Sequence, residues 1–246
     1  IEFESTAQQR AFLAANDSDP VNRWVAAQSI HSTAMLEIAA NLRAGRQPAM
    51  PAVLLDVMRA LLADASSDPA LLALARTLPD PGYVAALEVT MDVDGIATAH
   101  RFLRRQLGLQ LREAFTLRFE ERRVRAPYAP TPAQTGTRKL ANVCLGYLGA
   151  IDDEDSHALA TAHFDAADNM TDTMGALAAL RNSSSDAREQ LFARFEAKWR
   201  DEPLVLDKWF SLEALAWRND ALVRIRSLLA HPRFNARNPN RVRALV

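Results

Sequence analysis

The sequence contains little glycine, a single cysteine and few aromatic side chains. Only 8 of its 246 residues are Gly and 7% are Phe, Trp or Tyr, whereas Gly usually makes up about 7% of a globular chain by itself. This scarcity excludes the glycine-rich loops that bind phosphate or dinucleotides, because such loops need several closely spaced glycines. Cys144 stands alone, so the chain forms no internal disulfide. It lies in the apolar run Val143 to Leu145, and we expect a core residue rather than a nucleophile.

Two further absences concern charge and long apolar runs. With 29 Lys and Arg against 30 Asp and Glu, the formal net charge is -1, which gives no overall field for attracting nucleic acid or anionic membranes. No apolar stretch reaches the roughly 18 residues that a membrane-spanning helix needs, and no charged-then-apolar leader opens the sequence. We therefore expect no nucleic-acid partner, no membrane partner and a cytoplasmic location.

Alanine, the strongest helix former, is abundant, at 45 of 246 residues. Asp19, Asp68 and Asp80 each precede a proline, which is the pattern of an N-capping carboxylate followed by Pro at the first helical position. Apolar residues then recur with a 3.6-residue period from Val21 to Leu42, ahead of Gly45 as a stop. Amphipathic periodicity predicts further helices over residues 53–62, 71–78, 83–89, 96–123, 140–148, 158–164, 174–180, 187–199, 205–215 and 222–229.

Many short helices joined by brief turns favour an all-α irregular superhelix of stacked helical hairpins, a HEAT- or armadillo-like solenoid, over a four-helix bundle. The alternation of Ile1–Glu4 predicts the remnant of a preceding β-strand. We expect residues 1–246 to form a single helical domain. Its two sub-bundles would be residues 5–125 and 137–246, joined by the proline-rich loop 126–136.

The residue patterns of known catalytic and metal centres are missing from the sequence. A helical zinc site needs two His and a Glu on one face, as in H-E-x-x-H, and none of the histidines has this spacing, so we expect each in a core or surface role: His31, His100, His157, His163 and His231. The acidic segments 92–95 and 152–155 lack the alternating ligands of a calcium loop. Both are expected to cap helix N-termini.

Two basic zones remain. Residues 101–125 contain eight Arg against three Glu, and residues 218–246 contain seven Arg against one Asp. Arginine suits bidentate binding of carboxylate or phosphate. We favour solvated helix faces for the first zone, whereas solvated faces and ligand binding are equally open for the second.

Several segments, taken in order, are similar to one family. They are Asp17–Trp24, Asp92–Ile96, Arg138–Leu148, Phe164–Asp172, Ala176–Leu180, Asp207–Phe210 and Asn238–Arg243. Together they resemble the C-terminal helical domain of bacterial aminopeptidase N, the zinc-dependent alanyl aminopeptidases of the gluzincin type. The resemblance extends over nearly the whole chain, and it implies a superhelical fold.

The resemblance implies a non-catalytic part of a larger metalloprotease. In that family the H-E-x-x-H motif and its one zinc ion lie in an earlier catalytic domain, a β-sandwich follows, and the helical domain closes the catalytic chamber. No catalytic residue, metal ligand or cofactor is then expected on this chain. Its partners would be the catalytic and β-sandwich domains of the same polypeptide, with peptides as substrates of the parent. By the family pattern, the chain also stops before the last helices of the superhelix.

The resemblance also implies one candidate substrate-binding site. The family's Asn-Pro-Asn-Arg-x-Arg segment brings an arginine toward the chamber, and its second arginine falls on Arg243. The hypothesis is that Arg243, helped by Arg241, attracts the carboxylate end of short peptides, and the alternative is an ordinary capping or ion-pairing role. For the whole chain, the alternatives are a free-standing HEAT-like scaffold that binds protein partners and an independent α-helical enzyme.

Overall fold

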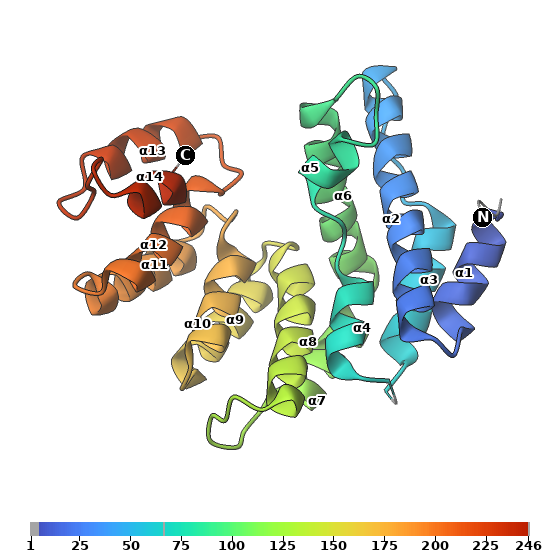
Figure 1. Ribbon diagram of the computed structural model, residues 1–246, viewed down its shortest axis with the longest axis horizontal. Coiled ribbons are helices and arrows are strands. Elements are labelled where there is room, and N and C mark those ends of the chain that lie inside the picture. Colours follow the sequence, from blue (N-terminus) through green and yellow to red (C-terminus); the bar gives the residue numbers. More distant parts are fainter. Residues whose placement is uncertain (1–4, 66, 246) are drawn as a thin grey trace. The chain divides into compact units, whose positions relative to one another are not determined.

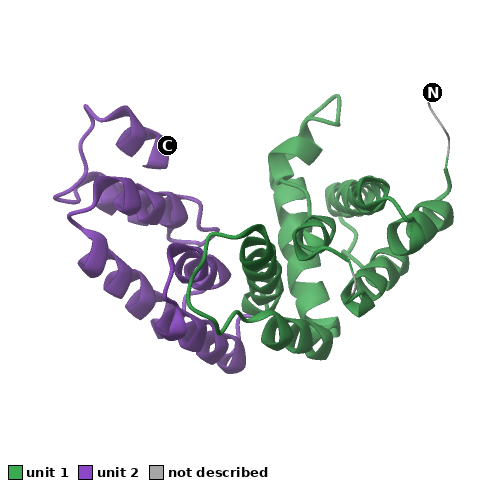
Figure 2. Cartoon of the chain, turned by 60° about the horizontal axis from the view of Figure 1, so that its bottom comes forward, with its two compact units in different colours: residues 1–151 green, residues 152–246 purple. Residues whose placement is uncertain are grey.

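The computed structural model describes residues 5–65 and 67–245. The chain divides into two compact units, residues 1–151 and 152–246 (Figure 2). Every regular element of the described part is a helix (Figure 1), which confirms the predicted all-α class. The β-strand expected at Ile1–Glu4 lies outside the described residues.

Unit 1 is built around helices α2 and α8. Its described helices are α1 (Ala7–Asn16), α2 (Pro20–Arg43), α3 (Ala52–Ala63), α4 (Pro69–Arg76), α5 (Pro81–Ala85), α6 (Val93–Gln110), α7 (Arg112–Arg122) and α8 (Pro132–Gly149). Helix α2 packs against α1, α4 and α6, and α8 packs against α4, α6 and α7 (Figure 1). Helices α4 and α6 therefore contact both central helices and join the two halves of the unit.

The helix starts predicted from the Asp-Pro pairs are confirmed. The side chain of Asp19 accepts a hydrogen bond of 2.7 Å from the Val21 N–H, and Asp68 and Asp80 cap α4 and α5 in the same way. Helix α2 ends at Arg43, and Gly45 follows with φ +69°, the left-handed conformation that glycine adopts without strain. These boundaries depend on neighbouring residues alone, which is why local patterns predict them.

Three predicted segments differ from the structure. The long helix expected over residues 96–123 is interrupted at Leu111, where α6 ends and α7 begins. The helix expected over residues 83–89 is only the short α5. The proline-rich segment 126–136 is a loop only in its first half, because Thr131 caps Gln134 N–H and Pro132 opens α8.

The division between the compact units follows Ile151, whereas the proline-rich segment lies within unit 1. This segment connects α7 to α8, and these two helices pack against each other. A loop between two helices in contact closes a hairpin rather than separating two units.

Helices α6 and α8 meet at a close crossing. A Cβ added to Gly108 would lie 2.4 Å from the Tyr147 backbone oxygen, so only glycine allows this approach. The Tyr147 ring stacks on Phe115, with the ring centroids 4.6 Å apart, and its hydroxyl donates to the Arg76 carbonyl over 2.5 Å. Burial raises the pKa of the Tyr147 phenol above its usual range, so this hydroxyl stays a donor.

Unit 2 is a second series of paired helices. Those described are α9 (Glu154–Ala166), α10 (Met170–Leu180), α11 (Asp186–Trp199), α12 (Pro203–Ala214), α13 (Ala221–Leu229) and α14 (Pro239–Leu245). Helix α12 packs against α11, α13 and α14. Its Trp209 donates from Nε1 to the Phe192 carbonyl of α11 over 3.1 Å, so the apolar core and a buried hydrogen bond together join these two helices.

Candidate functional site

The acidic and thiol-bearing positions singled out in the sequence have structural roles. Asp92 caps α6 and Asp153 caps α9, which confirms the expected capping turns. Cys144 is fully buried, as expected of a core residue, and burial raises the pKa of its thiol to about 11. A thiol with that pKa is protonated near neutral pH and is a poor nucleophile.

His157, Asp152 and Ser183 lie close together at the start of unit 2, in a trio that resembles a hydrolytic triad. Nε2 of His157 is 2.8 Å from Asp152 Oδ1 and 3.3 Å from Ser183 Oγ. A triad needs the serine and the carboxylate on different ring nitrogens, so that the imidazole can take a proton on one side while the other is held. Here both oxygens meet the same nitrogen, and the trio cannot relay a proton.

Arg241, one of the two predicted site residues, lies inside unit 2. Its guanidinium is buried, pairs through Nε with Asp207, and donates to the carbonyls of Arg233 (2.7 Å) and Pro203 (3.1 Å). The Phe210 ring centroid lies 4.8 Å from the guanidinium carbon, a cation–π distance. Arg241 thus joins α14 to α12, and the two family-like segments 207–210 and 238–243 meet through it.

Arg243, the other predicted site residue, is exposed on the same helix. Positions two apart on a helix point to different sides, so the buried anchor at Arg241 leaves Arg243 directed outward. The N-terminal end of the helix is also fixed, because the side-chain oxygen of Asn238 accepts a hydrogen bond from the backbone N–H of Asn240 over 3.0 Å. Arg243 is therefore a cation held on a well-anchored short helix.

The rest of the second basic zone is mostly neutralised within unit 2. Glu213 is fully buried and contacts Arg188 (2.6 Å) and Arg224 (2.6 Å), while Glu189 and Asp220 both pair with Arg218 at 2.9 Å. The hydrogen bond with Asp220 raises the pKa of Arg218, and the one with Glu213 raises that of Arg224. These arginines support the fold, and their guanidinium groups are already paired with carboxylates of unit 2.

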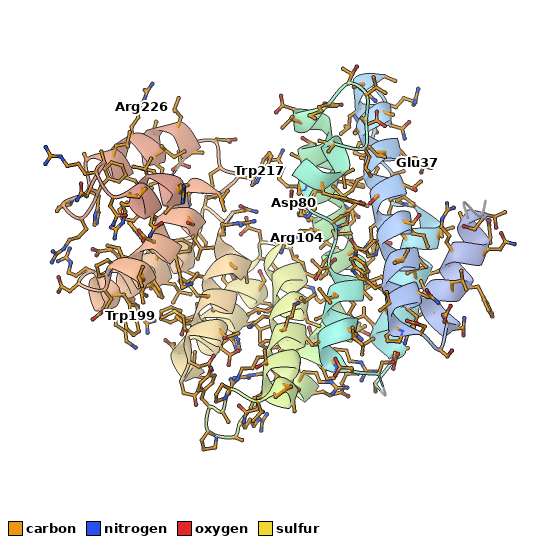
Figure 3. The ribbon with its side chains drawn as sticks, in the orientation of Figure 1. Glu37, Asp80, Arg104, Trp199, Trp217 and Arg226 are labelled. Carbon is orange, nitrogen blue, oxygen red and sulfur yellow. The ribbon has the colours of Figure 1, made fainter. Side chains whose placement is uncertain are left out.

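Three arginines of this zone have no ion pair among the described residues. They are Arg226, Arg237 and Arg243, and all three side chains are exposed. Figure 3 shows Arg226 pointing away from α13. These three arginines place positive charge on and between α13 and α14, where an anionic group can reach it from solvent.

The first basic zone follows the expected solvated helix faces only in part: Arg101, Arg105 and Arg125 are exposed, whereas Arg118 and Arg122 donate to backbone carbonyls. Arg118 donates to the carbonyls of Leu62 (2.6 Å) and Ala63 (3.1 Å), and Arg122 donates to Ala65 (3.0 Å). Arg76 of α4 donates to Leu61 and Asp64. The last carbonyls of a helix lack partners and carry partial negative charge. These three arginines satisfy carbonyls of the last turn of α3 and of the two residues that follow it.

The described residues contain no donor set for the zinc ion that the family resemblance implies. Among them, no group of three or more His, Cys, Asp or Glu is placed to hold a metal ion. The described part of the chain also contains no helix that is both long and apolar enough to cross a membrane.

Comparison with known proteins gives matches along the whole chain. Aminopeptidase N is 32% identical in Escherichia coli (strain K12), 32% in Caulobacter vibrioides and 33% in Haemophilus influenzae. Each match covers 100% of this chain but only 28% of the relative. The chain thus spans less than a third of the length of these curated relatives.

One solved structure and one protein family also match this chain over nearly its whole length. Legionella pneumophila aminopeptidase A in complex with aspartic acid superposes with a TM-score of 0.83 at 25% identity, over 99% of this chain and 29% of that chain. Residues 7–246 match the family described as "Domain of unknown function (DUF3458_C) ARM repeats", which confirms the predicted armadillo-like solenoid. The chain belongs to this family of ARM-repeat domains, and it resembles the C-terminal domain of bacterial aminopeptidase N along its whole length.

Proposed function

We propose that this chain is the C-terminal domain of a longer cytoplasmic zinc aminopeptidase that removes N-terminal residues, small or basic ones by preference, from peptides. The whole-chain match to aminopeptidase N, at 28% of the relatives' length, carries this proposal. The described residues do not fit a zinc ion, so the proposal assigns the metal and the bond-breaking chemistry to the remainder of the polypeptide. This chain caps the catalytic chamber and is inactive alone.

The part played by this chain is to guide substrate. Arg243 is exposed and Arg241 fixes the helix that carries it. An arginine forms charge-assisted, bidentate hydrogen bonds with a carboxylate. We assign Arg243 to the carboxylate end of short peptides, and Arg241 to holding α14 in position.

The proposal is tested by comparing two proteins, this 246-residue chain and the longer polypeptide that contains it. Both are assayed on alanyl-nitroanilide with zinc and with a chelator. We expect hydrolysis by the longer polypeptide, loss of activity with the chelator, and none by the 246-residue chain. Zinc-dependent turnover by the short chain, or a longer polypeptide that is inactive with zinc, would overturn the proposal.

The second candidate is a free-standing scaffold that binds proteins, and the ARM-repeat family favours it, because such repeats form extended binding surfaces. The reading frame before Ile1 separates the two. An H-E-x-x-H motif in the same frame supports the aminopeptidase, whereas a start codon at Ile1 supports the scaffold.

A further inference from the structure

The segment that leads from α13 into α14 contains three turns of one kind. In each turn a side chain accepts a hydrogen bond from the backbone N–H two residues later: His231 from Arg233 over 3.1 Å, Asn235 from Arg237 over 2.9 Å, and Asn238 from Asn240 over 3.0 Å. Asparagine commonly forms such turns. His231 takes the same place in the first turn, and it is the one of these three side chains that can gain a proton near neutral pH.

The hydrogen bond from Arg233 fixes the state of the His231 ring. A backbone N–H only donates, so Nδ1 of His231 accepts and carries no hydrogen. The neutral ring therefore has its hydrogen on Nε2, which lies 3.4 Å from Oε1 of Glu196 on α11. Protonation places a second hydrogen on Nδ1, directed at the Arg233 N–H. Two donors then face each other, and the turn opens.

Arg233 links this turn to the arginine that anchors α14. Its N–H donates to His231, its carbonyl accepts from Nη1 of Arg241 over 2.7 Å, and its side chain pairs with Asp201. The Phe210 ring of α12 contacts both His231, with the ring centroids 5.3 Å apart, and the Arg241 guanidinium, at 4.8 Å. Opening the turn moves the Arg233 carbonyl, so Arg241 loses one of the hydrogen bonds that hold it.

The groups that pack against His231 leave Nδ1 to the Arg233 N–H. Glu196 is the carboxylate that the described part of the chain places beside the ring, and it approaches Nε2. The same Glu196 oxygen also accepts from Arg200, at the end of α11, over 3.1 Å. Helix α12 presents the rings of Trp209 and Phe210, whose centroids lie 5.5 and 5.3 Å from that of His231. A protonated His231 therefore keeps its contact with Glu196 and gives up the turn.

We propose that His231 is a positioning residue for Arg243 and makes substrate binding at this arginine sensitive to pH. The inference rests on the proposed function, because it takes Arg243 to bind the carboxylate end of short peptides. Arg243 lies two residues after Arg241 on the seven-residue helix α14. With His231 neutral, Arg241 is fully held and fixes this helix. With His231 protonated, Arg241 is held less firmly, and Arg243 is no longer kept in one place.

Two variants separate the hydrogen bond of His231 from its charge. In His231→Asn the side-chain oxygen takes the place of Nδ1, as it does in the turns of Asn235 and Asn238, and it does not titrate. In His231→Leu the acceptor is lost at every pH. Both variants are made in the 246-residue chain and in the longer polypeptide, and far-UV circular dichroism confirms their fold.

The first readout needs no enzyme activity. It is the exchange with water of the buried Arg241 Nε–H, which pairs with Asp207, measured by NMR in the 246-residue chain at pH 7.5 and 5.5 relative to free arginine at the same pH. We expect its protection to fall about tenfold in acid, to stay constant in His231→Asn and to be low at both pH values in His231→Leu. The buried Arg188, whose Nε–H donates to Arg181 over 3.4 Å, is the control and should not change. Protection of Arg241 that is independent of pH, or that falls equally in His231→Asn, would overturn the proposal.

The second readout is the KM of the longer polypeptide for an alanyl dipeptide, divided by its KM for alanyl-nitroanilide. The nitroanilide has no carboxylate, whereas the carboxylate of the dipeptide stays charged at pH 5.5. We expect this ratio to rise about fivefold from pH 7.5 to 5.5 and to stay constant in His231→Asn. The same rise in both proteins contradicts a role for His231. A longer polypeptide that hydrolyses neither substrate contradicts the proposed function alone, and the exchange of Arg241 then decides on His231.

Discussion

Arg188 and Glu213 form an ion pair of 2.6 Å in which the side chains are 1% and 0% exposed. Glu213 also accepts two hydrogen bonds from Arg224, so one buried carboxylate joins α11, α12 and α13. Two arginines share its charge, and without this carboxylate each would keep only its contact with the more exposed Glu189, at 2.9 Å for Arg188 and 3.8 Å for Arg224.

Glu213→Gln is expected to lower the free energy of unfolding of unit 2 by about 3 kcal/mol, because removing one member of a buried pair leaves the buried Arg188 with only the more exposed Glu189 as a charged partner. Urea denaturation followed by tryptophan fluorescence measures this, since Trp199, Trp209 and Trp217 all lie in unit 2. The control is Glu202→Gln at an exposed position, which should change the value by less than about 0.5 kcal/mol. Similar losses of unfolding free energy for both variants would show that the buried ion pair stabilises unit 2 no more than an exposed glutamate does.

Gly108→Ala is expected to destabilise unit 1 by about 1–3 kcal/mol, because its Cβ would force the α6 and α8 backbones apart. Gly146→Ala on α8 is the matched control. Its Cβ would meet no backbone atom but only the guanidinium of Arg104, at 3.0 Å, the group that donates to the Gly146 carbonyl, and Ala favours a helix over Gly. Thermal unfolding should therefore give a lower Tm for Gly108→Ala and an unchanged or higher Tm for Gly146→Ala. A lower Tm for Gly146→Ala than for Gly108→Ala would contradict the close approach of α6 and α8 at Gly108.

The stability of unit 1 should fall in acid partly through His31. Burial lowers the pKa of this fully buried imidazole from 6.5 to about 4. The unfolded chain therefore binds a proton at a higher pH than the folded one, so stability is complete above about pH 6.5 and is lost as the pH falls toward 4. Between pH 7 and 4.5 the loss amounts to about 2–3 kcal/mol.

The variant His31→Leu isolates this contribution, because the acidic residues titrate equally in both proteins. Urea denaturation followed by far-UV circular dichroism at pH 7 and pH 4.5 should show a smaller drop for the variant. Equal drops in the two proteins would mean that His31 is not the titrating group.

Arg243→Ala in the longer polypeptide should raise KM for an alanyl dipeptide about tenfold, through loss of a charge-assisted hydrogen bond to its carboxylate. KM for alanyl-nitroanilide, which has no carboxylate, should not change. Arg226→Ala, at another exposed arginine of unit 2, serves as the control and should leave both values unchanged. An unchanged dipeptide KM for Arg243→Ala would remove Arg243 from the substrate path.

The parts of the fold that were predictable are those specified by neighbouring residues. Asp19, Asp68 and Asp80 each cap a helix two or three residues away, so their pattern is visible in sequence. The break at Leu111 falls within a leucine-rich stretch, and Gly108, one turn earlier, lies inside α6 rather than at its end. Helix α1 was not predicted, although Thr6 and Gln9 form a capping box that a search for this motif would have found.

For the candidate site, the sequence showed two zones with more Arg than Asp and Glu, but not which of these arginines are buried and which are exposed. Arg241 pairs with Asp207, 34 positions earlier, and Arg118 donates to carbonyls more than 50 positions earlier. Such pairs depend on tertiary packing, which no local pattern encodes. Counting charges therefore could not separate the buried Arg241 from the exposed Arg243.

Arg76, Arg118 and Arg122, which donate to carbonyls at the end of α3, also affect when this helix can reach its final state during synthesis. The capping side chains lie between 12 and 57 positions after the carbonyls that they satisfy. A ribosome that has released only the first hundred residues exposes α3 with most of these carbonyls bound to water. The helix reaches its final state only after Arg122 has emerged, so the first half of unit 1 waits for the second half before its folding is complete.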